Sequence, residues 1–150
     1  MTAILFVCLG NICRSPTAEA VTRALAGTET QLTFDSAGTA GWHVGDAPYP
    51  QMCAAAQARG YALSGLRARQ FSPRDFGQFS LIVAMDKANL TEVEAQRPIG
   101  ATTPARRFTD FAPDTGFDHV PDPYYTRDFD QALDLVEVCA RGLLSDLRSD

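Results

Sequence analysis

The sequence predicts an α/β fold in which a four-stranded parallel sheet carries helices on both faces. Two wholly apolar segments, residues 3–7 and 81–84, are typical of strands that are buried on both sides. Segments with helical spacing alternate with the strand segments, as they do where parallel strands are joined by helices. The chain has 150 residues, of which 45% are hydrophobic and 21% charged, so we expect one globular domain over residues 1–150.

The first strand ends at Cys8, and a helix follows it after a short turn. Ser15 and Pro16 predict the start of this helix, because serine is a preferred N-cap and proline is tolerated at the first helical position. Glu19 would then lie in the first turn, where the helix dipole stabilises a carboxylate. Apolar residues continue at helical spacing as far as Gly27, which ends the helix.

The remaining elements follow in the same alternating order. Further strands are predicted at residues 32–36, 81–84 and 106–108. Further helices are predicted at residues 50–59 with Gly60 as the C′ residue, after Ser72 and Pro73, at residues 88–95, and along an apolar stripe from Phe129 to Leu147. Gly142 lies inside the last helix, where glycine costs about 1 kcal/mol relative to alanine.

Cysteine and histidine spacing excludes the common metal sites. The cysteines are Cys8, Cys13, Cys53 and Cys139. Their spacing fits no zinc motif, and His43 and His119 are too scattered for a His-rich site, so we expect free thiols, no metal and no other cofactor. Cys53 and Cys139 fall in predicted helices and are expected to be core residues.

Hydropathy and charge exclude further classes of protein. No apolar stretch approaches the ~20 residues of a membrane span, and the N-terminus lacks the basic region of a signal peptide. The net charge of −5 argues against a general affinity for nucleic acid. We therefore expect a cytoplasmic protein with neither membrane nor nucleic-acid partners.

The turn after Cys8 has the residues of an anion-binding loop. A phosphate needs several N–H donors that point at one place, and residues that tolerate a left-handed backbone can turn successive amides inward. Gly10 and Asn11 are such residues, the helix N-terminus adds N–H donors, and the Arg14 guanidinium can bind two phosphate oxygens. The predicted phosphate-binding loop comprises Leu9, Gly10, Asn11, Ile12, Cys13, Arg14 and Ser15.

The same loop would hold the Cys8 thiol beneath a bound phosphate. An arginine and a helix N-terminus both favour the thiolate form of a nearby cysteine. A thiolate in that position is a nucleophile for in-line attack on phosphorus. A buried cysteine, a Gly-Asn turn or a Ser-Pro helix start is common on its own, but their combination at the carboxyl end of one strand favours a catalytic function.

Residues 8–16, CLGNICRSP, resemble the C-x5-R-S/T loop of protein tyrosine phosphatases, and the position of this loop near the N-terminus resembles the low-molecular-weight family. The resemblance extends over nearly all of the chain. It implies a single phosphatase domain that hydrolyses phosphotyrosine in proteins, with tyrosine kinases among the candidate substrates, as a monomer or weak homo-oligomer. Cys8 would form a cysteinyl-phosphate, while Arg14 would bind the phosphate.

Residues 121–125, PDPYY, are similar to the second motif of that family. A phenolate leaving group needs a proton, because phenol has a pKa of ~10, and two flanking prolines would hold Asp122 in a rigid extended loop. The resemblance makes Asp122 the general acid and then the general base for water, and Asp118 is the alternative.

Aromatic residues are the implied walls of the substrate cleft. The resemblance places Tyr124 and Tyr125 there, and Trp42 lies in another loop that should line the cleft. Ordinary packing is the alternative for all three.

The resemblance also implies a hydrogen-bond network that supports the loop. Asn11 and Ser15 belong to it directly, Ser36 matches a serine after the second strand, and Asp86 matches a conformationally important acid. Many relatives place a histidine where this chain has Leu66, so we expect weaker support of the loop or a water in its place.

Cys13 follows Cys8 by five residues. In the family that the chain resembles, such a neighbour can form a reversible disulfide with the nucleophile, and a reactive thiolate beside a second cysteine is the usual arrangement of a redox sensor. The resemblance therefore implies redox sensitivity.

Other activities of similar proteins fit less well. Arsenate reductases need two further cysteines near the middle of the chain, and residues 60–100 contain none. Protein arginine phosphatases favour threonine at the position of Ile12, where an apolar residue suits a phenyl ring better. A phosphate-binding or redox-signalling module with little turnover stays open because of Leu66.

Overall fold

The computed structural model describes residues 2–29 and 31–148. The strands are β1 (Thr2–Cys8), β2 (Leu32–Gly38), β3 (Leu81–Ala84) and β4 (Ala105–Arg107). The α-helices are α1 (Arg14–Ala26), α2 (Pro50–Gln57), α3 (Asp75–Gln78), α4 (Lys87–Ala95), α5 (Pro123–Thr126) and α6 (Phe129–Arg148), and two 3₁₀ helices are η1 (Phe108–Phe111) and η2 (Pro113–Thr115).

All strands are parallel and follow the order β2-β1-β3-β4, which confirms the predicted four-stranded sheet. The central strand β1 pairs with β2 as far as Cys8 opposite Gly38, and with β3 as far as Val7 opposite Ala84. The chain reaches β2 and β3 on opposite sides of β1, so the strand order reverses beside the carboxyl end of β1. Ligands of open parallel sheets bind at such a reversal.

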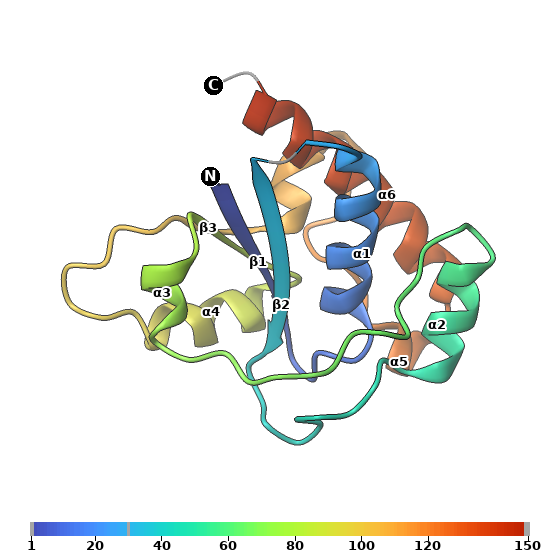
Figure 1. Ribbon diagram of the computed structural model, residues 1–150, viewed down its shortest axis with the longest axis horizontal. Helices are drawn as coiled ribbons and strands as arrows, with labels where there is room; N and C mark the ends of the chain where they lie inside the picture. Colours follow the sequence, from blue (N-terminus) through green and yellow to red (C-terminus); the bar gives the residue numbers. More distant parts are fainter. Residues whose placement is uncertain (1, 30, 149–150) are drawn as a thin grey trace.

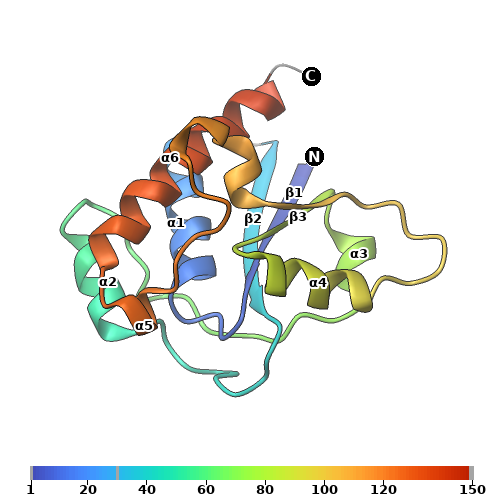
Figure 2. The same ribbon diagram turned by 180° about the vertical axis from the view of Figure 1, so that it is seen from behind.

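Helices cover both faces of the sheet, as predicted (Figures 1 and 2). Alternate side chains of β1 point to opposite sides: Ile4 and Phe6 join the apolar core shared with α1 and α6, whereas Leu5 and Val7 join a second core with α3 and α4. Cys139 of α6 is fully buried in the first core, and this burial raises the pKa of its thiol to about 12. It is a core residue, as the sequence predicted.

The start of α1 differs from the prediction. The helix begins at Arg14 with Cys13 in the N-cap position, so Pro16 is the third helical residue and not the first. The Ser15 hydroxyl does not cap the helix, because it lies between the Cys8 sulfur and the Asn11 side chain. Glu19 consequently lies beyond the first turn, where its carboxylate is buried.

The other boundaries lie within two residues of the predicted ones. The short helix expected directly after Ser72 and Pro73 begins only at Asp75. The Asp75 carboxylate accepts a hydrogen bond from the Ser72 backbone N–H (2.9 Å), which holds the intervening residues in a turn. Among the described residues, no helix combines the length and the apolar composition that a membrane span requires.

Gly142 allows α6 to pack closely against η1. A Cβ atom at position 142 would lie 1.9 Å from the carbonyl oxygen of Phe111, a backbone atom that cannot rotate away. The glycine therefore costs helix propensity and is still required by packing.

We expect Gly142→Ala to lower the free energy of unfolding by roughly 2 kcal/mol, because overpacking of a backbone contact outweighs the gain of about 1 kcal/mol in helix propensity. Urea denaturation would measure this difference. Gly77→Ala is the matched control, since Gly77 is also helical but a Cβ there would meet nothing within 4 Å. A stabilised Gly142→Ala protein would contradict the close contact.

Candidate active site

A cavity of about 160 Å³ opens at the carboxyl end of β1. It brings together the turn after Cys8, the loop around Trp42 and the segment that begins at Asp122, which are far apart in the sequence. Its lining residues are Cys8, Leu9, Gly10, Ile12, Cys13, Arg14, Trp42, His43, Asp122, Tyr124 and Tyr125.

The turn after Cys8 is held from outside by its carbonyl groups. The carbonyls of Cys8 and Leu9 accept hydrogen bonds from the N–H groups of Thr39 and Ala40 (both 2.9 Å), and the Ile12 carbonyl accepts one from Tyr49 (2.8 Å). With these carbonyls occupied on the outer side, the peptide groups of the turn can present N–H donors to the cavity.

Two residues at this turn explain its tight course. Asn11 adopts the left-handed conformation (φ 58°), as its residue type suggested, whereas Gly10 does not. A Cβ atom on Gly38, at the end of β2, would lie 2.8 Å from the Leu9 carbonyl oxygen. Gly38 therefore permits the close approach of the turn to the neighbouring strand.

Cys8 lies at the floor of the cavity and is almost completely buried. Its sulfur accepts a hydrogen bond from the Asn11 backbone N–H (3.2 Å) and lies 2.9 Å from the Ser15 hydroxyl oxygen. The Asn11 N–H and the Ser15 hydroxyl group therefore both contact this sulfur.

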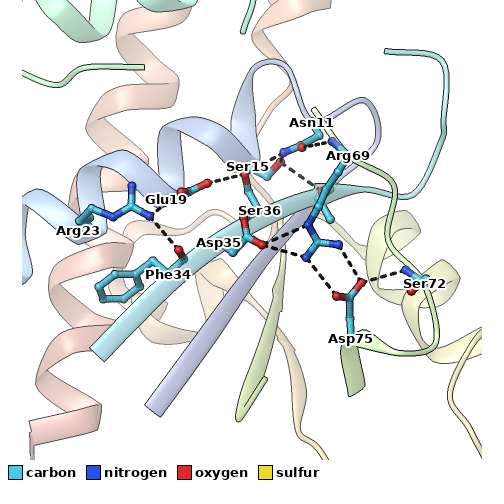
Figure 3. A network of polar contacts seen from close by, with 11 residues as sticks. Asn11, Ser15, Glu19, Arg23, Phe34, Asp35, Ser36, Arg69, Ser72 and Asp75 are labelled. Carbon is cyan, nitrogen blue, oxygen red and sulfur yellow. Dashed lines mark hydrogen bonds and ion pairs between the residues drawn. The ribbon is translucent and has the colours of Figure 1, made fainter. Parts of the chain in front are cut away.

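The side chain of Asn11 is the centre of the polar network shown in Figure 3. Its amide nitrogen donates to the hydroxyl oxygens of Ser15 (2.8 Å) and Ser36 (3.0 Å), and its amide oxygen accepts from the Arg69 backbone N–H (3.0 Å). The structure thus brings together three residues that the sequence singled out and adds Arg69 to them.

Glu19 extends this network in a way that the sequence analysis missed. One carboxylate oxygen accepts from the Ser36 hydroxyl (2.7 Å), and the other binds the Arg23 guanidinium (2.6 Å) (Figure 3). The i,i+4 spacing of Glu19 and Arg23 was the available signal, because such pairs meet on one face of a helix.

Arg69 fixes the segment that passes behind the turn. Its guanidinium binds the carboxylates of Asp35 and Asp75, each at 3.1 Å, and the Asp75 carboxylate is buried (Figure 3). Leu66, the departure from the resembled family, donates its backbone N–H to the Leu63 carbonyl oxygen. The backbone N–H of Arg69 is the donor that reaches Asn11 from this segment.

Arg14 is a buried cation that connects three elements. One guanidinium nitrogen donates to Asp86 at the end of β3 (2.7 Å) and to the Val120 carbonyl oxygen (3.0 Å), while the other lies 3.5 Å from Asp122. Burial disfavours the charged guanidinium, but negative charge on Cys8, Asp122 and Asp86 outweighs burial and raises the Arg14 pKa above its usual value.

Asp122 lines the same cavity as Cys8 and caps α5. Its carboxylate accepts a hydrogen bond from the Tyr124 backbone N–H (3.0 Å). Asp118, the alternative acid, is an exposed side chain that pairs with His119, and hydrogen bonding to that imidazole lowers the Asp118 pKa. Asp118 is not among the residues that line the cavity.

Cys13 also lines the cavity, next to the buried end of α1. Burial, together with negative charge on Asp122 and Cys8, raises the pKa of its thiol to about 12. Cys13 therefore stays protonated at neutral pH.

Aromatic side chains form the rim of the cavity. Trp42 and Tyr125 are about three-quarters exposed, and Tyr124 packs edge-on against Tyr125 with ring centroids 5.3 Å apart. His43 also lines the cavity, with its imidazole held by Asp46 (3.2 Å), and the sequence analysis did not assign it there. Among the described residues, no group of three or more His, Cys, Asp or Glu side chains is arranged to hold a metal ion.

The chain is similar to proteins of known family over its whole length. YfkJ, a low molecular weight protein-tyrosine-phosphatase of Bacillus subtilis, is 38% identical over 153 residues that cover 100% of this chain and 98% of that protein. A putative low molecular weight protein-tyrosine-phosphatase of Synechocystis is 44% identical over 150 residues, which cover 96% of this chain and 95% of that protein.

Solved structures agree with these sequence comparisons. The crystal structure of YfkJ has a TM-score of 0.94 over 99% of this chain and 96% of its own. A crystal structure of a protein tyrosine phosphatase from Entamoeba histolytica, with Hepes in its active site, has a TM-score of 0.93 at 33% identity and covers 99% of this chain and 98% of that one.

The family model described as low molecular weight phosphotyrosine protein phosphatase matches residues 3–150, which include the turn after Cys8, Arg14 and the PDPYY segment. With the fold, the cavity and the relatives in agreement, the chain belongs to the low-molecular-weight phosphotyrosine protein phosphatase family and is a protein-tyrosine-phosphatase.

Proposed function

We propose that the chain is a single phosphatase domain that hydrolyses phosphotyrosine in proteins through a cysteinyl-phosphate on Cys8. The observation that carries the proposal is the placement of one cysteine sulfur at the floor of a cavity. The sulfur is within 3.2 Å of the Asn11 N–H and 2.9 Å of the Ser15 hydroxyl, and both Arg14 and Asp122 line the same cavity.

In the first step the Cys8 thiolate attacks phosphorus. The S–P bond forms while the bond between phosphorus and the phenolic oxygen breaks, and Asp122 donates a proton to that oxygen. The Arg14 guanidinium and the N–H groups of the turn stabilise the negative charge on the equatorial phosphoryl oxygens.

In the second step water attacks the cysteinyl-phosphate. The Asp122 carboxylate accepts a proton from that water, the S–P bond breaks, and inorganic phosphate leaves with Cys8 again a thiolate. The Ile12 side chain is apolar and lines the cavity. This favours a phenyl ring as the substrate group that lies above the phosphate.

The role of Cys13 is proposed on the same geometry. A peroxide oxidises the Cys8 thiolate to a sulfenic acid, and the Cys13 thiol then displaces water from it to form a disulfide. The raised pKa of Cys13, about 12, keeps its own thiol protonated, and the thiolate is the form of cysteine that reacts with peroxide.

Replacement of Cys8 by serine tests the nucleophile. We expect Cys8→Ser to lower the rate of aryl phosphate hydrolysis by roughly 10⁴-fold or more, the order of loss found when a covalent nucleophile is removed. The rate of release of inorganic phosphate by the reduced protein is the measurement. Cys53→Ser is the control, because Cys53 lies on α2 outside the lining of the cavity. An unchanged rate of aryl phosphate hydrolysis in Cys8→Ser would refute the proposed function.

Replacement of Asp122 by alanine tests the general acid. We expect kcat/KM for a phosphotyrosine peptide to fall by about 10²- to 10⁴-fold, and kcat/KM for an ester with a more acidic leaving group to fall much less, because the second substrate needs less help from an acid. Asp118→Asn should leave both values near those of the unmodified protein. Equal losses on the two substrates in Asp122→Ala would remove Asp122 from this role.

Oxidation tests the proposed role of Cys13. Brief treatment with hydrogen peroxide should inactivate the protein, and a thiol reductant should restore most of the activity. In Cys13→Ser the restored fraction should be clearly smaller, because no disulfide shields the Cys8 sulfenic acid from further oxidation. Mass spectrometry of the oxidised protein without a Cys8–Cys13 link would contradict the proposal.

A further inference from the structure

Arg127, at the C-terminal end of α5, has an unusual backbone conformation. It is left-handed (φ 63°, ψ 12°), and among the described residues Asn11 and Arg127 are the two positions other than glycine with positive φ. Asparagine adopts this conformation readily, whereas for arginine it costs free energy and persists only where the surroundings impose it. The backbone N–H of Arg127 donates to the Pro123 carbonyl oxygen (2.9 Å), which closes the single turn of α5.

The side chain of Arg127 makes contacts that offset the free-energy cost of this backbone conformation. Its guanidinium donates to the hydroxyl of Tyr49 (3.0 Å) and, at 3.4 Å, to the carbonyl oxygen of Tyr124. It also lies 5.3 Å from the ring centroids of both Tyr49 and Phe129, within the range of cation–π attraction.

Tyr49 connects this contact to the phosphate-binding loop. Its backbone N–H donates to the Ile12 carbonyl oxygen (2.8 Å), and its ring packs edge-on against Tyr124 with centroids 5.4 Å apart. Arg127 thereby couples the segment that carries Asp122 to the loop that carries Cys8, through one intermediate residue.

α5 is short enough for a contact at one end to set the position of the other. It has four residues, and Asp122 caps its N-terminus through the Tyr124 N–H. Misplacement of a catalytic group by about 1 Å can cost ~100-fold in rate, so anchoring at both ends of this turn bears directly on proton transfer. Arg127 itself is not among the residues that line the cavity.

We propose that Arg127 is a positioning residue that sets the place of Asp122 relative to Cys8 by tying α5 to Tyr49. This inference rests on the proposed function, because it assumes that Asp122 acts as the general acid. Arg127 neither touches the substrate nor transfers a proton.

Arg127→Gly is the informative variant, because glycine accepts the left-handed backbone and removes only the guanidinium contacts. We expect kcat/KM for a phosphotyrosine peptide to fall by roughly 10- to 100-fold, and kcat/KM for 4-nitrophenyl phosphate to fall much less. Arg127→Lys should recover part of the loss, since it retains the charge but lacks the planar group that lies against the rings. Arg97→Ala is the matched control, because Arg97 also lies over an aromatic ring (Phe76, 4.8 Å) but on the opposite face of the sheet.

A double-mutant cycle separates positioning from a general loss of structure. In an Asp122→Ala background, Arg127→Gly should lower kcat/KM for the phosphotyrosine peptide by no more than about twofold, because the group that it positions is already absent. Equal losses on both substrates in Arg127→Gly, or full additivity with Asp122→Ala, would overturn the inference.

Two further results keep the inference distinct from the proposed function. If Arg127→Gly does not fold, Tyr49→Phe takes its place, because it removes only the hydroxyl group that accepts from Arg127. This variant must show the same substrate-dependent loss of kcat/KM, but a smaller one. An unchanged kcat/KM in Tyr49→Phe would also overturn the inference. A Cys8→Ser protein that retained activity would refute the proposed function, whereas a Cys8-dependent protein indifferent to Arg127→Gly would refute only the positioning role.

Discussion

The site depends on the side-chain amide of Asn11. Its left-handed backbone turns the chain back over the end of β1, and its three side-chain hydrogen bonds reach Ser15 on α1, Ser36 on β2 and the backbone of Arg69. One residue therefore fixes the conformation of the turn and also its position against two elements. An aspartate could adopt the same backbone, but it lacks the two N–H donors that serve both hydroxyl groups.

Glu19 determines which groups of this network donate hydrogen bonds and which accept them. A carboxylate that binds Arg23 can only accept, so the Ser36 hydroxyl donates to Glu19 and must accept from Asn11. The Asn11 nitrogen then also donates to Ser15, whose own proton is left for the Cys8 sulfur at 2.9 Å or the Ala37 carbonyl oxygen at 3.4 Å. The shorter contact favours the sulfur. The buried Glu19 carboxylate, paired on α1 with the exposed Arg23 guanidinium, thus orients a hydroxyl dipole toward the proposed nucleophile.

The sequence predicted β1 and β3 well because their apolar composition is a local property, and β3 lies at the predicted residues. The start of α1 was wrong because the Ser15 hydroxyl, a good N-cap by residue type, is used by Cys8 and Asn11 instead. The positions of Arg69 and Arg127 could not be predicted, because both bind partners that are close only in the folded chain. The residues of the phosphate-binding loop could therefore be predicted from the sequence, whereas the long-range contacts that hold the loop in place could not.

The charges around Arg14 bear on how the proposed cycle works. One buried cation faces the Cys8 sulfur and the carboxylates of Asp86 and Asp122 before a phosphate monoester enters. Asp86, at 2.7 Å, holds the guanidinium by a close hydrogen bond, while Asp122 approaches it only to 3.5 Å. A bound phosphate would take the place of Asp122 at one guanidinium nitrogen, while Asp86 keeps its hydrogen bond to the other. In the proposed cycle, phosphate binding would thus release the Asp122 carboxyl group toward the leaving group, and product release would restore the contact between Asp122 and Arg14.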